Sequence, residues 1–542
     1  MRNRDPRPWA RRDRARQIAA YGAALLGLLG LVSAISRPLQ PRLALLLEIM
    51  PVTVPRAAAV TVVFISFPLL LLARGLRSGQ RLAWTATLGL LAASVLLHLV
   101  KGLDVEESVL ALAGGVWLAW HRAAFPVLPS RAAAVRAVVL AVAGAVVVVV
   151  VAVATAEAVE RGERLGSAQH MARYREATLV ALGLGLLATV LWLLLSPHTP
   201  AQLTGAAQRR ERERARTVVR AYGSGTLDYF ALRDDKQWFF SEHSVVAYAV
   251  RSGVCVVSPD PIGPIPEREE VWADFMRYAE SYGWSVTVIG ASPDWLPVYE
   301  GFGLRSLYLG DEAVVDCPSF TLEGRPMRGV RQAVNRVRRE GIRVTFHDPA
   351  DLAPSMKEEL LEIATQSRRG EVERGFSMTL SRLFDPDDNG LLLSVASGPS
   401  GVPVGFTQYV PAPGIDGWSL DVMRRSADPS LPNGVMDLLV VETIRHVAQS
   451  GGRGLGLNFS VLRETVAGES RTPGANVGRT VLQRLSRHVQ VESLWRFNAK
   501  FYPRWQPRYL VVGSLDAVAA QGFAVAGLEG LTDLPVVGRL IR

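Results

Sequence analysis

Residues 135–156 read VRAVVLAVAGAVVVVVVAVATA, with valine at every position from 146 to 151. Apart from Arg136 near its start, this stretch has no charged side chain. A helix needs ~20 apolar residues to cross the hydrocarbon layer of a membrane. The stretch therefore predicts a membrane-spanning helix.

Similar apolar stretches occur on both sides of this one within the first 200 residues. They cover residues 17–36, 56–72, 82–100, 105–120 and 178–195. We therefore expect a transmembrane bundle of about six helices over residues 17–196. Charged residues are nearly absent from the span centres, which favours an anchor over a transport pathway.

The arginines around these spans predict an orientation. The leader, residues 1–16, contains seven arginines, and the segment after the last span is also basic. Basic flanks usually stay on the cytoplasmic side of a membrane. The loop 157–176, with four arginines on the expected outer side, opposes this scheme. With an even number of spans, both ends of the chain are expected in the cytoplasm.

The rest of the chain has the pattern of a water-exposed α/β domain. At 542 residues the chain exceeds a single core, which stops growing near roughly 250–300 residues. We expect a basic linker at 197–216, two α/β halves at 217–320 and 321–512, and a tail at 513–542. Predicted strands cover 254–258, 285–289, 313–315, 343–346, 391–396, 404–410, 417–421 and 455–458, and predicted helices cover 267–282, 357–368, 435–450 and 478–490.

The net charge and the number of cysteines limit which partners and binding sites are expected for this chain. The net charge of +10 suits an anionic membrane surface or an RNA, without choosing between them. The chain has only two cysteines, Cys255 and Cys317, so neither a disulfide framework nor a zinc site is expected. We predict no metal site.

A series of short blocks resembles the bacterial phosphatidylglycerol lysyltransferases. The segment SPDPIGP at 258–264 is similar to a turn of that family. Further similar blocks follow in the same order: YEGFG at 299–303, GDEA at 310–313, NR at 335–336 with Gly341, RGFSM at 374–378, SLDVMR at 419–424, PNGVMD at 432–437 and FNAKFYPRW at 497–505. The resemblance covers about residues 220–512. It implies a tandem acetyltransferase-like (GNAT) fold that moves an aminoacyl group from a tRNA to a lipid headgroup hydroxyl.

The resemblance also implies partners and a location. The expected substrates are aminoacyl-tRNA, as co-substrate without a further cofactor, and phosphatidylglycerol in an anionic cell membrane. Lysine is the expected amino acid, but Tyr308 stands where family members often carry lysine, which leaves alanine or ornithine open. A homodimer is possible. Such a product lowers the negative surface charge and gives resistance to cationic antimicrobial peptides.

Three residues are predicted to be catalytic. Asp421 and Arg424 lie three apart at the end of a predicted strand, where a turn could direct both into one cavity. Asp421 would bind an ammonium group or assist the attacking hydroxyl, and Arg424 would hold a phosphate. For an unselected Asp-x-x-Arg a surface ion pair is the commoner explanation, and the resemblance favours the functional one. Lys500 lies in an aromatic-rich segment suited to a terminal tRNA base or a lipid interface.

Five further residues are predicted to bind substrate. Asp311 and Glu312 would contact an amino group. Asn433 and Asp437 lie where a Pro-Asn-Gly turn enters a helix, whose free N–H groups suit an anion, although Asn433 could also be an ordinary helix cap. The fifth is Arg496.

Two other function classes remain open on the residues alone. An acyl-CoA-dependent acyltransferase would need a glycine-rich pyrophosphate loop between a strand and a helix, and the nearest candidate, RGLG at 453–456, has the wrong spacing. A non-enzymatic membrane sensor that binds a lipid or an amino acid is the second alternative.

Overall fold

The computed structural model describes residues 7–35, 66–102, 105–164, 168–196, 202–368, 375–461, 491–514 and 516–530. Its contacts divide the chain into two compact units. The first is helical and consists chiefly of Asn3–Pro200, and the second is an α/β unit formed by Ala201–Met276 and Val286–Arg542.

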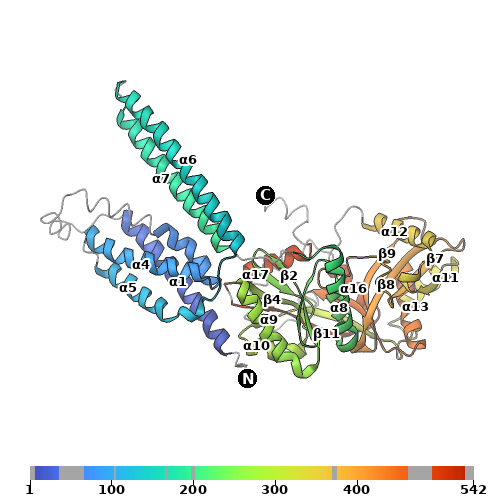
Figure 1. Ribbon diagram of the computed structural model, residues 1–542. Helices are drawn as coiled ribbons and strands as arrows, with labels where there is room; N and C mark the ends of the chain where they lie inside the picture. The colour runs from blue at the N-terminus through green and yellow to red at the C-terminus, as the bar shows by residue number, and fades with distance from the viewer. Residues whose placement is uncertain are drawn as a thin grey trace. The chain divides into compact units, whose positions relative to one another are not determined.

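The described part of the helical unit contains α1 (Arg7–Ile35), α4 (Arg81–Gly102), α5 (Val105–Trp120), α6 (Arg131–Arg164) and α7 (Ala168–Leu195), together with a helical segment at residues 66–77. Helices α4 and α5 pack together, as do α6 and α7 (Figure 1). Trp84 of α4 donates its indole N–H to the carbonyl of Leu118 in α5, at 2.8 Å.

Three of the described helical segments are long and apolar enough to cross a membrane: Trp9–Val32, Arg131–Thr155 and Thr178–Leu195. Valines such as Val138 and Val146 on α6 remain more than half exposed, as expected of a surface that faces lipid. The prediction of a helical membrane region is confirmed at this level. The predicted span 56–72 lies partly outside the described residues, and the total of six spans stays a prediction.

The α/β unit is built on one sheet, which has eleven strands in the described part of the chain. They are β1 (Gln237–Ser241), β2 (Ser244–Arg251), β3 (Val254–Val257), β4 (Ser285–Ala291), β5 (Arg305–Asp316), β6 (Arg343–His347), β7 (Leu392–Ser397), β8 (Pro403–Ala412), β9 (Gly417–Arg425), β10 (Gly454–Val461) and β11 (Arg504–Val512). Their order in the sheet is β1-β2-β3-β4-β11-β5-β10-β9-β8-β7-β6.

This strand order contains two related halves. Strands β1 to β4 follow one another from one edge, and β6 to β10 follow one another from the other edge. The closing strand of each half is exchanged: β11 pairs with β4 of the first half, and β5 pairs with β10 of the second. β5 and β11 also pair with each other, antiparallel, along most of their length. The predicted fold class, an α/β domain with two related halves, is therefore confirmed, and the exchange joins the halves into one sheet.

Eight described helices cover this sheet: α8 (Gly205–Tyr222), α9 (Arg268–Tyr282), α10 (Leu296–Gly301), α11 (Arg328–Arg339), α12 (Pro354–Arg368), α13 (Val435–Gln449), α16 (Val491–Ala499) and α17 (Val518–Leu528). In the second half, α11 and α13 pack on one face, where Val334 and Leu439 meet Tyr409 and Leu420 of the strands. On the opposite face, α12 packs against the neighbouring strand positions, including Phe406. This two-sided burial follows from the alternation of side chains along each strand.

The predicted linker at 197–216 needs correction. From Gly205 onward it is helix α8, which packs into the α/β unit through Ala215 and Val219. Arg212 and Arg216, which suggested a solvated basic segment, are buried instead. Both guanidinium groups bind the carboxylate of Asp388 at 2.9 Å. The sequence pattern did not reveal this partner because it lies more than 170 residues away.

Other boundaries also differ from the predictions. The predicted tail at 513–542 contains helix α17, where the buried Gln521 donates its side-chain amide to the carbonyl of Val286. The strand predicted at 417–421 continues to Arg425 as β9. Strands β1, β2 and β11 and helices α8, α10, α11, α16 and α17 were not predicted. The predicted helix at 478–490 lies outside the described residues.

Candidate functional site

Strands β9 and β10 separate near the middle of the sheet. They run parallel but pair only where Leu455 and Gly456 face Trp418 and Ser419. Beyond this point β10 continues to pair only with β5, its partner on the other side, after an irregularity between Gly456 and Phe459. Strand β9 has its own irregularity, because Gln408 and Tyr409 of β8 face Val422 and Leu420, which leaves the intervening residue without an opposite partner. A bulge of this kind redirects a side chain and often lies near a functional site.

Asp421 is that intervening residue. Its carboxylate is buried, and it accepts hydrogen bonds from the backbone N–H of Leu380 and the side-chain amide of Gln408, both at 2.7 Å. Arg424, half-buried further along β9, donates to the carbonyl of Met423 at 2.9 Å. Both residues therefore lie inside the strand, and the turn expected after Asp421 is not there because β9 continues to Arg425.

Glu312 of β5 lies fully buried at the centre of the sheet. Arg508 of β11 donates from Nη2 to its Oε2 at 2.6 Å, and the Thr226 hydroxyl donates to the same oxygen at 2.6 Å. Burial alone would lower the pKa of Arg508, but the negative charge of Glu312 raises it above its ordinary value. The pair therefore keeps both charges inside the sheet. The ion pair forms because Glu312 lies on β5, Arg508 lies on β11, and these two exchanged strands pair with each other.

Two buried polar atoms without partners lie close together in this part of the sheet. Within the described residues, Glu312 Oε1 and Ser419 Oγ have no hydrogen-bond partner. A Cβ atom at Gly456 would lie 3.1 Å from Ser419 Oγ and 3.3 Å from Glu312 Oε1, so both atoms flank the glycine where β9 and β10 part. Buried polar groups are nearly always satisfied, and exceptions call for an explanation such as a polar ligand. This cluster is our candidate reaction centre.

The two acidic residues predicted to contact an amino group do not lie together. Asp311 is buried next to Glu312 on β5. Adjacent residues of a strand point to opposite faces of the sheet. Only Glu312 is therefore directed at the cluster beside Ser419.

Three other predicted residues meet at a second place, between α11, α13 and the end of α16. Asn433, Asp437 and Lys500 line a cavity of about 370 Å³. Lys500 Nζ lies 2.9 Å from Asp437 Oδ1 and 4.8 Å from the ring centre of Phe497. The ammonium group is thus held at the cavity wall while its side chain stays 44 % exposed.

The helix cap at this cavity is Gly434, which corrects the assignment of Asn433 as an ordinary cap. Gly434 has a φ of +116°, and a Cβ atom there would lie 2.9 Å from Cβ of Ala333. Both facts require glycine at this position. The close approach of α11 to the start of α13 therefore depends on it.

A larger cavity of about 920 Å³ adjoins the second one. Tyr502 and Pro326 line both cavities. The larger one is also lined by Asp316, Glu323, Asp416, Arg453 and Arg504. Arg504 falls in the 497–505 block and Arg453 in the RGLG stretch at 453–456, but no motif in the sequence indicated the three acidic residues, because they come from separate loops and strand ends. Arg496, the remaining predicted residue, is exposed on α16.

Asp260 of the 258–264 block has a structural explanation. Its carboxylate accepts from the Tyr299 hydroxyl at 2.7 Å and from the backbone N–H of Ser292 at 2.8 Å. Burial raises the pKa of Asp260 to about 6, although both hydrogen bonds act to lower it. One contact thus connects two of the blocks, 258–264 and 299–303, that carried the family resemblance.

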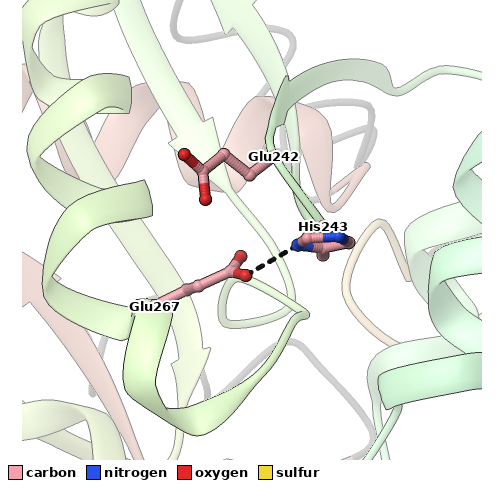
Figure 2. Close-up of side chains that lie close together, drawn as sticks. All are labelled: Glu242, His243 and Glu267. Atoms are coloured by element: carbon pink, nitrogen blue, oxygen red, sulfur yellow. Dashed lines mark hydrogen bonds and ion pairs between the residues drawn. The ribbon is translucent and has the colours of Figure 1, made fainter.

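A separate cluster brings three potential metal ligands together near the β1–β2 turn. Figure 2 shows the His243 ring bonded to the Glu267 carboxylate, at 2.9 Å, with Glu242 nearby. Their ligand atoms lie within 4.8 Å of one another, and Glu242 and His243 are exposed. Ser244 also donates to Glu267. Exposed acidic groups often cluster without a metal, and the His243 and Glu267 side chains already have hydrogen-bond partners. We therefore assign the cluster no role.

Comparison with known proteins agrees with this architecture. The family model described as "Phosphatidylglycerol lysyltransferase, C-terminal" matches residues 216–512, more than half of the chain. A lysylphosphatidylglycerol biosynthesis bifunctional protein from Rhodococcus opacus is 39% identical over 365 residues, which cover 66% of this chain and 32% of that protein. A protein of the same name from Mycobacterium ulcerans is 38% identical over 65% of this chain and 32% of its own length. This chain therefore spans about a third of the length of these curated relatives.

Two solved structures resemble the α/β unit. One is L-PGS from Bacillus licheniformis, with a TM-score of 0.53 and 23% identity over 59% of this chain and 96% of that one. The other is the C-terminal domain of a protein named as a lysylphosphatidylglycerol synthetase from Agrobacterium fabrum, with a TM-score of 0.51 and 25% identity over 60% of this chain and 98% of that one. The matched region begins in α8 and ends with β11, so it contains the whole described sheet. The chain belongs to the phosphatidylglycerol lysyltransferase family.

Proposed function

We propose that this protein transfers an aminoacyl group, lysine first among the candidates, from a charged tRNA to a hydroxyl of the phosphatidylglycerol headgroup. The match of residues 216–512 to the lysyltransferase family carries this proposal. Within the described residues, the unpartnered oxygens of Glu312 and Ser419 beside Gly456, and the buried carboxylate of Asp421 two residues further along β9, support it, because such oxygens suit a small polar group with a positive charge.

The proposed reaction exchanges one ester for another. The lipid hydroxyl oxygen attacks the carbonyl carbon of the aminoacyl ester, the bond to the tRNA ribose oxygen breaks, and that oxygen takes up a proton. Because the energy of the first ester is retained in the second, the step needs no nucleotide triphosphate at the site. It needs a group that accepts the hydroxyl proton and donors that stabilise the developing oxyanion.

The described residues can be given roles in this step. Asp421 is the proposed base or ammonium ligand, and Glu312 Oε1 is a second acceptor for the ammonium group of the amino acid. Arg424 and Lys500 are the proposed ligands for phosphate groups of the two anionic substrates. Asp437 would position Lys500 through the ion pair at 2.9 Å.

The product explains the biological role that we propose. Phosphatidylglycerol carries one negative charge, and a lysyl ester adds two ammonium groups, so the lipid becomes positively charged. A membrane that contains this lipid binds cationic antimicrobial peptides less strongly. For this purpose we propose a multi-pass membrane protein with the α/β unit in the cytoplasm, where charged tRNA is made.

One assay tests the reaction against both alternatives. Full-length protein in nanodiscs is supplied with radiolabelled lysyl-tRNA and phosphatidylglycerol, and labelled lipid is separated by chromatography. We expect a ninhydrin-positive lipid that disappears after RNase treatment. Product formed equally well from an acyl-CoA would show an acyltransferase of another class. Binding of lipid or lysine without any product would favour the sensor.

A further inference from the structure

A tight turn between α12 and β7 ends on the carboxylate of Asp421. The structure describes this turn from Gly375 onward, so it contains most of the 374–378 block, to which the proposed reaction gives no role. The backbone N–H groups of Met378 and Thr379 both donate to the carbonyl of Gly375, at 3.2 and 3.0 Å. The next residue, Leu380, donates its N–H to Oδ1 of Asp421 at 2.7 Å. The conformation of the turn therefore determines where this N–H lies.

Arg233, from the first half of the α/β unit, contacts both ends of this turn. It follows the short helix η2 (Asp228–Leu232), whose five residues are all buried. Its Nη1 lies 3.1 Å from the carbonyl oxygen of Gly375, 3.2 Å from that of Thr379 and 2.6 Å from Thr379 Oγ1. The Thr379 hydroxyl in turn donates to the Gly375 carbonyl at 3.0 Å. One guanidinium group thus closes the turn that directly precedes Leu380.

The side chains of the turn are packed as firmly as its backbone is bonded. Leu380 is 2 % exposed and lies in a hydrophobic cluster with Phe230 of η2. Phe376 is fully buried in a second cluster. The backbone N–H of Ser377 donates to the Glu529 carboxylate at 3.0 Å. Residues far away in the sequence therefore hold the turn from several directions, and Arg233 supplies the polar contacts at its two ends.

We propose that Arg233 is a positioning residue for the aminoacyl transfer, because it holds the 375–379 turn so that the Leu380 N–H stays on the Asp421 carboxylate. This inference rests on the proposed function. In the described part of the chain Arg233 binds the turn and Asp235, so it acts on Asp421 through the backbone. A reacting group that moves by about 1 Å can lose about 10²-fold in rate. The first half thereby controls the geometry of a carboxylate that the second half carries.

A second set of contacts joins the same two segments and provides a matched control. Arg382 forms ion pairs with Asp234 and Asp385. The backbone N–H of Asp234 also donates to the Ser381 hydroxyl at 3.2 Å. These contacts lie just beyond Leu380 and leave the 375–379 turn untouched. Loss of Arg382 therefore weakens the junction between the segments without removing the contacts that close the turn.

The first test measures hydrogen exchange in full-length protein in nanodiscs, resolved to the Leu380 amide by fragmentation mass spectrometry. Arg233→Met removes the donors and keeps an unbranched side chain, whereas Thr379→Val removes only the hydroxyl contacts. An amide exchanges only when its hydrogen bond opens, so Arg233→Met should speed exchange at Leu380 by at least about tenfold. Thr379→Val should speed it less, and Arg382→Gln should leave it at the wild-type rate. Unchanged exchange in both Arg233→Met and Thr379→Val would overturn the proposal.

The second test measures kcat for lipid product in a double-mutant cycle with Asp421→Asn. We expect Arg233→Met to lower kcat by at least about tenfold, with KM for phosphatidylglycerol nearly unchanged. Arg233→Lys, whose ammonium group can still donate to the two carbonyls, should recover part of this loss. Arg382→Gln should keep the wild-type kcat. In the Asp421→Asn protein, Arg233→Met should cause almost no further loss, because the two residues then act as one unit.

A loss of kcat that is equally large with and without the Asp421 carboxylate would show a general structural effect and would overturn the positioning role. A normal kcat in Arg233→Met, despite faster exchange at Leu380, would overturn it as well. Melting curves verify that each protein is folded, and if Arg233→Met does not fold, Thr379→Val and Arg233→Lys take its place in both tests. A wild-type protein that makes no lysyl lipid would disprove the proposed function, and the exchange data would still decide whether Arg233 holds the turn on Asp421.

Discussion

The substitution Asp421→Asn separates a catalytic role of the carboxylate from a structural one. In the wild type both carboxylate oxygens accept hydrogen bonds, one from the N–H of Leu380 and the other from the amide of Gln408. An asparagine can keep both contacts. Its oxygen still accepts from Leu380, and its NH₂ group can donate to Gln408 after that side chain turns its amide around. Gln408 Oε1, which now has no partner among the described residues, would then gain one.

The expected cost in stability is therefore moderate. A hydrogen bond to a charged group contributes about 1.5–3 kcal/mol, and a neutral one about 0.5–1.5 kcal/mol. Two bonds that change from charged to neutral cost about 2–3 kcal/mol together on this scale. Loss of a charged group that acts in the transition state lowers the rate by about 10²–10³. We expect Asp421→Asn to form lysyl lipid at least about tenfold more slowly, a conservative lower limit on that range.

The assay is the initial rate of lipid product in nanodiscs, beside a melting curve of the same protein. Thr287→Val is the control, because it removes a buried hydrogen bond to the carbonyl of Val511 far along the chain from Asp421. It should lose comparable stability and keep its rate. If Asp421→Asn turns over at the wild-type rate, the carboxylate only supports the bulge in β9, and the reaction centre must be sought around Asp437 and Lys500.

Three further predictions follow from buried or paired charges. Asp388→Asn removes the buried carboxylate that Arg212 and Arg216 share and leaves them, among the described residues, only the more exposed Glu213 and Asp234, which should cost about 3–5 kcal/mol and lower the melting temperature by more than about 6 °C; a shift under one degree would mean that these exposed carboxylates or water compensate for the loss. Lys500→Met should raise KM for tRNA or lipid about tenfold or more at an almost unchanged melting temperature, because its half-exposed ion pair contributes at most about 1 kcal/mol; an unchanged KM for both substrates would remove Lys500 from the site. Burial lowers the pKa of Lys236 from 10.5 to about 7, so between these values the unfolded chain binds more protons and stability should rise with pH. Lys236→Met should flatten that rise in melting temperature between pH 7 and 10, and an equal rise in both proteins would refute the assignment.

Short sequence patterns predicted those strands and helices whose own residues carry a clear strand or helix pattern. Strands such as β3 and β7 are short, apolar and bounded by turn residues, so the residue composition and the spacing of the apolar residues were enough to locate them in the sequence. The amphipathic pattern of α9 and α13 predicted these helices within a residue or two. Strand β11 was missed because Pro507 and Arg508 interrupt an otherwise ordinary strand pattern. Helix α8 was missed because its arginines resemble a solvated linker.

The sequence supplied candidate site residues, which stay predictions, but it did not supply the geometry that the structure gives them. A spacing of three along a strand normally places two side chains on opposite faces. The bulge opposite Gln408 and Tyr409 changes this alternation at Asp421. A bulge depends on how two strands register with each other, and the sequence of one strand does not contain that information. The pairing of Asp437 with Lys500 depends in the same way on two segments 63 residues apart.

The exchange of β5 and β11 gives Glu312 a different environment, and therefore a different expected role, from the one that its sequence block suggests. Taken alone, an acidic residue in a GDEA block suggests a free carboxylate that waits for an ammonium group. In the folded chain Arg508 already neutralises one of its oxygens, through a contact between segments 196 residues apart. The remaining oxygen, Oε1, lies beside Ser419 and Gly456 where β9 and β10 separate. A ligand at this point would thus meet one acceptor oxygen in a nearly neutral surrounding, not a full negative charge. That favours a site which holds an amino group by directed hydrogen bonds and releases it after transfer, because a deeply buried unpaired charge would bind it too tightly and would itself cost several kcal/mol to bury.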